Sequence, residues 1–386
     1  MSDVADVVVA GAGIVGAACA RAFALRGLRT VVVDAAGVGG GATAAGMGHI
    51  VAMDDSPAQL ALTAYSQRLW RELAAELPPQ VEFDACGTLW VAADEEEMAE
   101  VLRKQGVYAS AGIATEVLDG AALADAEPQL RHGLAGALRV GSDAVLYPPC
   151  AAAFLIREAE RAGAELQTGR RIVSAAHGRL RLEGGTELRA ERIVVATGAD
   201  AGRLVPGLPV RKRRGHLVIT DRYPGWMRHQ LVELGYLKSA HSVSADSVAF
   251  NVQPRKTGQL LIGSSREYGA ESSDVNRTLL AAMLARAQSY LPCIGGLQAI
   301  RIWTGFRAAT PDKLPLIGPS PEDATLWMAT GHEGLGITTA LGTAELLVAG
   351  MLGEQAEIPL EPYLPGRLTT WGREAERASA PEKSHA

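Results

Sequence analysis

The sequence contains few cysteines, no excess of basic charge and no long apolar run. Only four of its 386 residues are cysteines, and they stand far apart without a Cys-x-x-Cys pair: Cys19, Cys86, Cys150 and Cys293. Disulfides, a metal site and an iron–sulfur cluster held by this chain alone are therefore not expected, and we predict reduced thiols. The formal net charge is −6. Because nucleic-acid binding needs a basic surface, no nucleic-acid partner is expected.

We also expect neither a membrane span nor an export signal. No apolar run approaches the roughly 18 residues that a spanning helix needs. The first residues, Met1 to Asp6, lack the basic start of a signal peptide. Apolar residues make up 48% of the chain, and its length allows two domains, each with its own core. We therefore expect a globular cytoplasmic protein, with any membrane contact made through partner proteins.

The first residues show the pattern of a strand, a glycine turn, a helix and a second strand. Asp6 to Ala10 runs into Gly11-Ala12-Gly13-Ile14-Val15-Gly16 and an alanine-rich stretch. Gly11 allows a tight turn, Gly13 lets a backbone amide approach a pyrophosphate, and Gly16 lets the helix sit close to the strand. The helix N-terminus offers free amides and a positive dipole end to phosphates. The pattern predicts a dinucleotide site; the alternative is an ordinary turn between strand and helix.

An acidic residue ends the second strand of this unit. Asp34 follows Thr30 to Val33 and lies about 20 residues after Gly13, the spacing expected of a carboxylate that holds a ribose hydroxyl. The segment 37–49 that follows is mostly glycine and alanine. Glycine and alanine have side chains too small to build a hydrophobic core. We therefore expect the backbone of this segment to lie against a flat or phosphorylated ligand.

Periodicity assigns most of the remaining elements. Helices are predicted over about 58–77, 95–105, 151–162, 276–290 and 338–352, the last with Gly353 as its C-cap. Strands are predicted within 81–92, 192–196, 216–220, 247–252, 259–263, 303–307 and 326–329. The basic run Arg211 to Arg214 is predicted to be a solvated strand edge rather than a phosphate or nucleic-acid site.

The chain resembles the D-amino-acid oxidase superfamily of flavoenzymes, which includes glycine and sarcosine oxidases. The resemblance rests on four ordered segments and covers residues up to about 370: Gly11 to Gly16 with Asp34, Ala44 to Met47, Ala196 to Ala199, and Gly331 to Gly336. Two of these segments look most like the flavin subunits of D-hydroxyproline dehydrogenase, opine oxidase and hydrogen cyanide synthase: Gly46 to Val51, and Gly331 to Ala340.

The resemblance implies an α/β fold, α+β overall, with two discontinuous domains. A Rossmann-like FAD-binding domain is expected in 1–50, 144–207 and 301–370. An antiparallel-sheet substrate domain is expected in 51–143 and 208–300, and a frayed charged tail in 371–386. A nicotinamide enzyme needs no second glycine-rich helix start near its C-terminus, whereas this chain has one at Gly334-Leu335-Gly336. By resemblance, its amides face the pyrimidine end of the flavin; the alternative is a glycine-capped surface helix.

The expected flavin contacts follow from the matched motifs. They are Gly11, Gly13, Ile14, Val15, Gly16, Asp34, Thr43, Ala44, Gly46, Met47, Ala196, Thr197, Gly198, Gly331, Gly334, Leu335, Gly336, Ile337 and Thr338. Sarcosine oxidases attach flavin to a cysteine where this chain has Gly305. The resemblance therefore implies non-covalent FAD.

Four residues are candidates for the chemistry. Arg307 is predicted to grip a substrate carboxylate with two parallel hydrogen bonds, as an arginine does in glycine-oxidase-like relatives; the alternative is a structural ion pair with Asp312 or Glu333. Met47 and His49 are predicted to border the flavin ring, although Met47 also suits a core. His332 is predicted to contact flavin or substrate, the alternative being a buried histidine satisfied by backbone. Four further residues of the middle sheet are open candidates for the pocket: Tyr236, Asn251, Arg255 and Tyr268.

The predicted reaction is oxidation of the C–N bond of an amino or imino acid, with hydride transfer to flavin N5. The best-matching substrate is cis-4-hydroxy-D-proline or another D-amino acid. The narrower resemblance implies a hetero-oligomer whose companion subunits, one with an iron–sulfur cluster, take the electrons. An oxygen-using glycine or sarcosine oxidase and an opine oxidase subunit remain alternatives. A non-catalytic flavin-binding subunit and an NAD-dependent dehydrogenase are alternatives from other classes.

Overall fold

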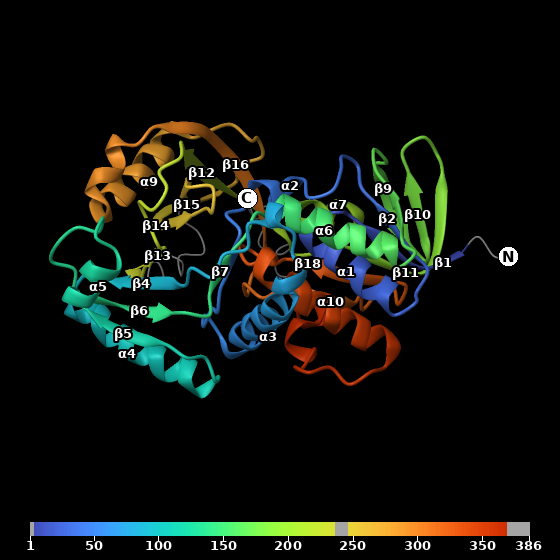
Figure 1. Ribbon diagram of the computed structural model, residues 1–386. Helices are drawn as coiled ribbons and strands as arrows, with labels where there is room; N and C mark the ends of the chain where they lie inside the picture. The colour runs from blue at the N-terminus through green and yellow to red at the C-terminus, as the bar shows by residue number, and fades with distance from the viewer. Residues whose placement is uncertain (1–3, 236–245, 369–386) are drawn as a thin grey trace, which may run out of the picture.

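Two sheet-centred halves lie side by side in the computed structural model, which describes residues 4–235 and 246–368 (Figure 1). The strand order of the first sheet is β17-β18-β11-β1-β2-β8, with β10 attached to β11 and β9 to β10. The second sheet has the order β16-β12-β15-β14-β13-β4-β6-β5. The predicted α/β class, α+β overall, is confirmed. The predicted tail 371–386 and the candidate Tyr236 lie outside the described residues.

The first sheet is parallel at its centre, where β1 pairs with β2 and β11, and β11 pairs with β18. Its strands are β1 (Val4–Ala10), β2 (Thr30–Val33), β8 (Glu165–Gln167), β9 (Ile172–Ala176), β10 (Arg179–Leu182), β11 (Glu187–Val195), β17 (Leu316–Pro319) and β18 (Leu326–Thr330). Val7 and Val9 of β1 enter one apolar core, and Val8 and Ala10 enter another. The strand is therefore covered on both faces, as its continuous apolar sequence predicts.

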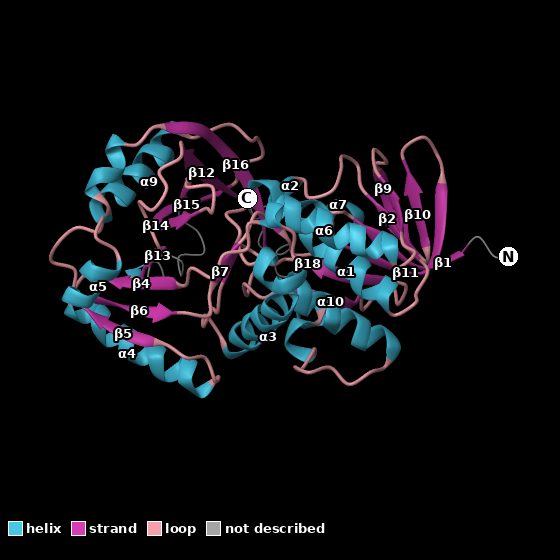
Figure 2. Ribbon diagram, viewed as in Figure 1, coloured by secondary structure: helices cyan, strands magenta, loops and turns pink. Residues whose placement is uncertain are grey.

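Helices cover one face of this sheet. They are α1 (Ile14–Leu25), α6 (Pro148–Arg161) and α10 (Gly336–Leu352), and α3 (Pro57–Leu73) packs against α10. Figure 2 shows α1 between α6 and α10. The alanines of α1, such as Ala17 and Ala20, are fully buried, and their small side chains allow the close approach of both neighbours. Short helical segments connect the elements: α2 (Gly41–Ala45), α7 (Ala201–Leu204), η1 (Ala74–Glu76), η2 (Pro79–Val81), η3 (Gly198–Asp200), η5 (Glu361–Tyr363) and η6 (Pro365–Leu368).

The second sheet is antiparallel except where β4 pairs with β13. Its strands are β4 (Thr88–Ala92), β5 (Glu116–Asp119), β6 (Gly136–Val140), β12 (Arg211–Thr220), β13 (Gln230–Glu233), β14 (Ser247–Pro254), β15 (Leu260–Tyr268) and β16 (Ala299–Ala309). The helical segments of this half are α4 (Glu95–Ser110), α5 (Gly120–Ala126), α9 (Arg277–Tyr290) and η4 (Pro292–Gly296). A two-stranded sheet of β3 (His49–Ile50) and β7 (Ala144–Val145) completes the described fold.

Two segments near the predicted domain boundaries pack with the other half of the structure. Residues 301–309 are predicted in the FAD-binding domain, whereas β16 pairs with β12 from Ala299 to Ala309 in the second sheet. Helix α3 is predicted in the substrate domain, whereas it packs against α10, and its Leu62 and Trp70 lie in the core of the first half. Periodicity reveals a helix or a strand, whereas its partner is set by distant parts of the chain.

The basic run of β12 is not the predicted solvated edge. Strand β12 lies between β16 and β15, and the exposed fractions of Arg213 and Arg214 are only 6% and 7%. Arg213 forms an ion pair with Glu333, and Arg214 pairs with Glu267 at 2.8 Å. The carboxylates that compensate these buried charges lie far away in the sequence, so the run alone predicts a solvated edge.

None of the helices in residues 4–235 and 246–368 combines the length and the apolar composition that a membrane span requires.

Candidate active site

A cavity of about 650 Å³ is lined by residues of both halves. Most of the predicted site residues line it: Gly11, Gly13, Ile14, Val15, Asp34, Thr43, Gly46, Met47, His49, Ala196, Thr197, Gly198, Arg307, His332, Gly334, Leu335, Gly336 and Ile337. Gly16, Ala44, Gly331 and Thr338 do not line the cavity. The structure thus brings the four matched sequence segments to one place.

The glycine turn between β1 and α1 leaves no room for side chains. A Cβ on Gly11 would lie 2.6 Å from the carbonyl oxygen of Ala196, and Gly11 has φ +108°. A Cβ on Gly16 would lie 2.0 Å from the carbonyl oxygen of Gly11. Gly16 therefore acts outside the cavity, by letting α1 rest against the turn.

The start of α1 faces the cavity with a hydroxyl beside it. The hydroxyl oxygen of Thr43 accepts a hydrogen bond from the Ile14 amide at 2.9 Å. The same oxygen lies 3.2 Å from the place of a Cβ on Gly13. Amides at the beginning of a helix have no partner within that helix. Thr43 and α1 together therefore offer hydroxyl and amide groups that suit a phosphate.

Asp34 holds the loops at the edge of the first sheet. Its Oδ2 accepts a hydrogen bond from the Ala12 amide at 2.8 Å, and its Oδ1 accepts from the amides of Ala36 at 2.8 Å and Gly37 at 3.0 Å. An ionised carboxylate has about four acceptor positions. The side chain therefore keeps acceptor capacity for ribose hydroxyls while it orients the glycine turn.

The second glycine-rich helix start, that of α10, lies against the segment after α2. A Cβ on Gly46 would lie 2.6 Å from Cδ1 of Ile337. The hydroxyl of Thr338 donates to the carbonyl oxygen of His49 at 2.9 Å. Thr338 therefore contributes by fixing the backbone of His49 to α10. Of the two remaining residues outside the cavity, Ala44 is exposed and Gly331 forms a turn with φ +78°.

His49 presents an unpaired ring nitrogen. Its Nε2 lies 3.3 Å from the carbonyl oxygen of Gly334. Because a carbonyl only accepts, Nε2 carries the proton and Nδ1 is left as an acceptor. Nδ1 is buried and has no partner in the described part of the chain. Burial lowers the pKa of His49 to about 4, so the ring is neutral at physiological pH.

The ring of His332 is buried and forms a hydrogen bond within the protein. Its Nε2 lies 3.0 Å from the hydroxyl oxygen of Thr343 on α10, and burial lowers the pKa of His332 to about 3. The ring lines the cavity but is satisfied by a threonine hydroxyl rather than by the backbone. This geometry favours a structural role for His332, and its predicted contact with flavin or substrate stays a prediction.

Arg307 projects from β16 into the cavity. Its Nη1 donates to the carbonyl oxygen of Ser265 at 2.9 Å. The two carboxylates considered as alternative partners pair with other arginines: Asp312 with Arg367 at 2.7 Å, and Glu333 with Arg213. Burial raises the pKa of Glu333, while the positive charges of Arg213 and Arg307 oppose that rise. The guanidinium of Arg307 is thus oriented by the second sheet within an electropositive part of the cavity.

Met47 is both a wall of the cavity and part of a core. It is buried beside Leu217, Ile219 and Leu261, as the core alternative expects, while its predicted place beside the flavin ring stays a prediction. Its carbonyl oxygen accepts a hydrogen bond from Nε2 of Gln253 at 2.7 Å. This bond ties the segment after α2 to β14 of the second sheet.

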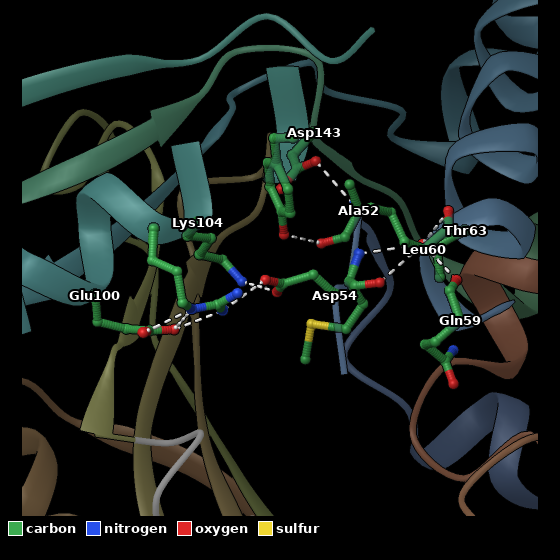
Figure 3. Close-up of polar contacts among 11 residues, drawn as sticks. Ala52, Asp54, Gln59, Leu60, Thr63, Glu100, Lys104 and Asp143 are labelled. Carbon is green, nitrogen blue, oxygen red and sulfur yellow. Dashed lines mark hydrogen bonds and ion pairs between the residues drawn. The ribbon is translucent and has the colours of Figure 1, made fainter. Parts of the chain in front are cut away.

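The segment between β3 and α3 forms another wall, and Figure 3 shows how it is fastened. Met53 lines the cavity. The Ala52 amide donates to Oδ1 of Asp143 at 3.1 Å, and Asp54 forms an ion pair with the buried Lys104. Burial raises the pKa of Asp143 to about 7. These contacts fix the segment to the second half.

Sequence reasoning missed several residues of the cavity. Gln230, Val232 and Trp90 line it from the second sheet, as do Lys212, Arg213, Ser264 and Arg266. Of the candidates in that sheet, Asn251 lines the cavity. Arg255 instead pairs with Glu82, and Tyr268 accepts a hydrogen bond from Arg213. Strand alternation predicts two faces, but it does not say which face meets the cavity.

The cavity fits FAD. Two helix starts meet in it, the glycine turn leaves backbone open to a pyrophosphate, and the hydroxyl oxygen of Thr197 is buried without a partner among the described residues. A Cβ on Gly305 would lie 2.4 Å from Cβ of Ala45. A cysteine at this place would therefore displace α2, which agrees with a non-covalent flavin.

Comparisons with known proteins agree with this site. The model of the family described as FAD dependent oxidoreductase, DAO, matches residues 6–349. Glycine oxidase of Pseudomonas aeruginosa is 27% identical over 390 residues, covering 94% of this chain and 99% of that protein. Hydrogen cyanide synthase subunit HcnC of the same organism is 28% identical over 426 residues, covering 95% of this chain and 97% of that protein.

Solved structures share the fold over nearly the whole chain. Glycine oxidase from Geobacillus kaustophilus superposes with a TM-score of 0.83 at 26% identity, covering 93% of this chain and 98% of that one. L-proline dehydrogenase from P. horikoshii superposes with a TM-score of 0.85 at 21% identity, covering 96% and 99%. The chain therefore belongs to the DAO family of FAD-dependent oxidoreductases, within the D-amino-acid oxidase superfamily that its glycine motifs predict.

Proposed function

We propose that this flavoenzyme oxidises the C–N bond of an amino or imino acid, with cis-4-hydroxy-D-proline or another D-amino acid as substrate. The observation that carries the proposal is the position of Arg307. A guanidinium oriented by β15 and β16 lies in the same cavity as the glycine-rich start of α10. An arginine binds a carboxylate with two parallel hydrogen bonds. Arg307 thus anchors the carboxylate and fixes the substrate Cα.

FAD supplies the two-electron acceptor, and the chain supplies orientation and a dry site. With the carboxylate on Arg307, the substrate amine lies within the part of the cavity that His49 also lines. The neutral ring of His49, with its acceptor Nδ1, suits an N–H group of the substrate. Its low pKa makes it a weak base, so we propose that it orients an amine which arrives neutral. Met47 and Met53 give this part of the cavity apolar walls.

Electron transfer to companion subunits is part of the proposal. HcnC, one of the relatives, is named as a subunit of hydrogen cyanide synthase. We propose that this chain likewise belongs to a hetero-oligomer in which a companion with an iron–sulfur cluster takes the electrons. Glycine oxidases are similar to this chain over more than nine-tenths of its length, and they support a second candidate function, a self-contained oxidase of glycine that uses oxygen.

Anaerobic reduction of the flavin tests the proposal. The purified yellow holoprotein is mixed with cis-4-hydroxy-D-proline, D-proline, glycine, sarcosine and opines, and bleaching is followed by absorbance. Bleaching by a D-imino acid, followed by rapid dye reduction and slow oxygen use, is expected. Bleaching by glycine with fast oxygen use favours the second candidate. If no amino acid bleaches the flavin, with or without the companion subunits, the chain is a non-catalytic flavin-binding subunit and the proposal is wrong.

A matched pair of arginine variants tests the anchor. Arg307→Ala removes the carboxylate contact, so we expect KM to rise by about 100-fold, as for a lost charge-assisted bidentate contact. Arg301→Ala is the control, because Arg301 is exposed on the same strand and its guanidinium lies over Trp303. Equal KM values for the two variants would remove Arg307 from its role.

A further inference from the structure

Three buried polar side chains of the second sheet belong to residues that line the cavity, and each has a buried polar atom without a partner among the described residues. They are Trp90 on β4, Gln230 on β13 and Asn251 on β14, with exposed fractions of 2%, 2% and 7%. The atoms are the indole Nε1 of Trp90, Oε1 of Gln230 and Oδ1 of Asn251, and none has a hydrogen-bond partner in the ranges 4–235 and 246–368. A buried polar group without a partner costs about 1–3 kcal/mol. Three such groups in one cavity indicate a ligand that pairs with them.

Strand register places the three side chains together. Val232 of β13 is the Cα partner of both Trp90 on β4 and Asn251 on β14. Adjacent strands lie about 4.8 Å apart. Trp90 and Asn251 therefore flank Val232, with their Cα atoms about 10 Å from each other. Gln230 is two residues before Val232 and so shares its face of the sheet. Trp90, Gln230 and Asn251 therefore form a polar patch around Val232 on one face of the second sheet.

Register also places this patch next to the carboxylate anchor. Asn251 pairs with Gly263 on β15, and Ser265, which accepts the hydrogen bond from Arg307, follows two residues later on the same strand. The patch therefore lies one strand away from the anchor along the cavity. A substrate held by its carboxylate on Arg307 reaches the patch with its side chain.

The chemistry of the patch selects the group that it binds. Indole N–H is a donor only, whereas the two amide oxygens are acceptors. A carboxylate cannot donate to the amide oxygens, and an ammonium group cannot accept from the indole. A hydroxyl does both through one oxygen atom: it accepts from the indole N–H and donates its single proton to one of the two amide oxygens.

We propose that Trp90, Gln230 and Asn251 form a side-chain subsite that binds a hydroxyl group of the substrate and discriminates against its unsubstituted analogue. This inference rests on the proposed function and names the substrate class of the same site. A site built to pair with a hydroxyl rejects the analogue that lacks it, because its own polar groups then stay unpaired.

Paired substrates on the holoenzyme test the subsite. Anaerobic titrations with cis-4-hydroxy-D-proline and D-proline, and with D-serine and D-alanine, give the rate of flavin reduction and, from the perturbed flavin spectrum, Kd. We expect at least about a 10-fold preference for the hydroxylated member of each pair. Trp90→Phe and Asn251→Leu, which remove one polar group each, should lower that preference by about 10-fold.

The matched control is Trp327→Phe. Trp327 is also a buried tryptophan whose indole N–H has no partner in the part of the chain that the structure describes, but it does not line the cavity. Its variant should keep the wild-type preference. Equal Kd values and rates within each pair for the wild type, or a preference that survives both subsite variants, would overturn the subsite. If none of the compounds reduces the flavin, the proposed function fails, and the Kd ratios alone then decide the subsite.

Discussion

The guanidinium of Arg307 lies against the backbone of Gly215, where a Cβ would stand 2.4 Å from Nη1. Gly215 lies on β12, and its Cα partner on β16 is Gly305. The missing side chain therefore leaves the space that the arginine head occupies. The position of Arg307 is set by its neighbours across two strands as well as by its own bond to Ser265.

Gly215→Ala should displace the Arg307 head without breaking the strand. Gly215 has no positive φ, so alanine is compatible with the backbone there. We expect Kd for amino-acid substrates to rise by about 10-fold, as for one weakened hydrogen bond to a charged group. Titration of the holoenzyme measures Kd, and amine analogues without a carboxylate serve as the control. Unchanged binding of carboxylate substrates would show that Gly215 does not position Arg307.

Gly16→Ala should impair folding of the FAD site. The new Cβ would meet the backbone carbonyl of Gly11 at 2.0 Å, and no side-chain rotation relieves that contact. We expect a loss of about 1–3 kcal/mol in the free energy of unfolding, with loss of bound FAD. Denaturant unfolding and the flavin content of the purified protein measure both effects.

Gly106→Ala is the control for that substitution. Gly106 is an exposed helical glycine of α4 with no atoms within 4 Å of its missing Cβ. Alanine there should stabilise the protein by roughly 0.5–1 kcal/mol through helix propensity. Similar behaviour of the two variants would contradict the close approach at Gly16.

Asp34→Ala should weaken FAD binding by about 10- to 100-fold, because hydrogen bonds to a carboxylate contribute roughly 1.5–3 kcal/mol each. The substitution also removes the acceptors of the Ala12, Ala36 and Gly37 amides. Asp34→Glu keeps the charge and should retain most of the affinity. Quenching of free FAD fluorescence gives both Kd values; a flavin Kd unaffected by Asp34→Ala would exclude a ribose contact.

Asp143 should make stability depend on pH. Burial raises its folded-state pKa from 3.8 to about 7, so the folded protein binds a proton more tightly than the unfolded chain. The contribution of this proton to the free energy of unfolding is fully present below pH 3.8 and is lost as pH rises through 7. Wild type should therefore lose stability, on the order of a few kcal/mol, as pH rises between these values.

Asp143→Asn tests this linkage, because asparagine keeps an acceptor for the Ala52 amide and cannot ionise. Compared with wild type, the variant should show a Tm that changes less between about pH 4 and pH 7, the range bounded by the two pKa values. Parallel Tm curves for the two proteins would show that Asp143 does not carry the effect.

Sequence was sufficient where the signal is local. Gly11, Gly13 and Asp34 lie within one strand–helix–strand unit, so spacing alone predicted their arrangement at the cavity. The glycine-rich start of α10 is also a local signal, and the resemblance implies its place beside the flavin. These elements depend on backbone conformation and short-range order, which the residues themselves encode.

Sequence was insufficient where partners are distant. Arg213 is buried because Glu333 lies against it across 120 positions, and neither residue reveals the other. The polar patch of Trp90, Gln230 and Asn251 is created by strand register between three separate segments. Register depends on the whole sheet and its turns, so alternation within one strand did not identify these residues.

The contact between Gly305 and Ala45 has a consequence for how the protein is made and stored. Without a chemical tether, cofactor occupancy follows mass action, and the folded state gains about 2.7 kcal/mol when free FAD is a hundredfold above its Kd. Cells short of riboflavin would accumulate a less stable apoprotein, whereas dialysis and refilling should allow the native cofactor to be exchanged for flavin analogues of chosen potential.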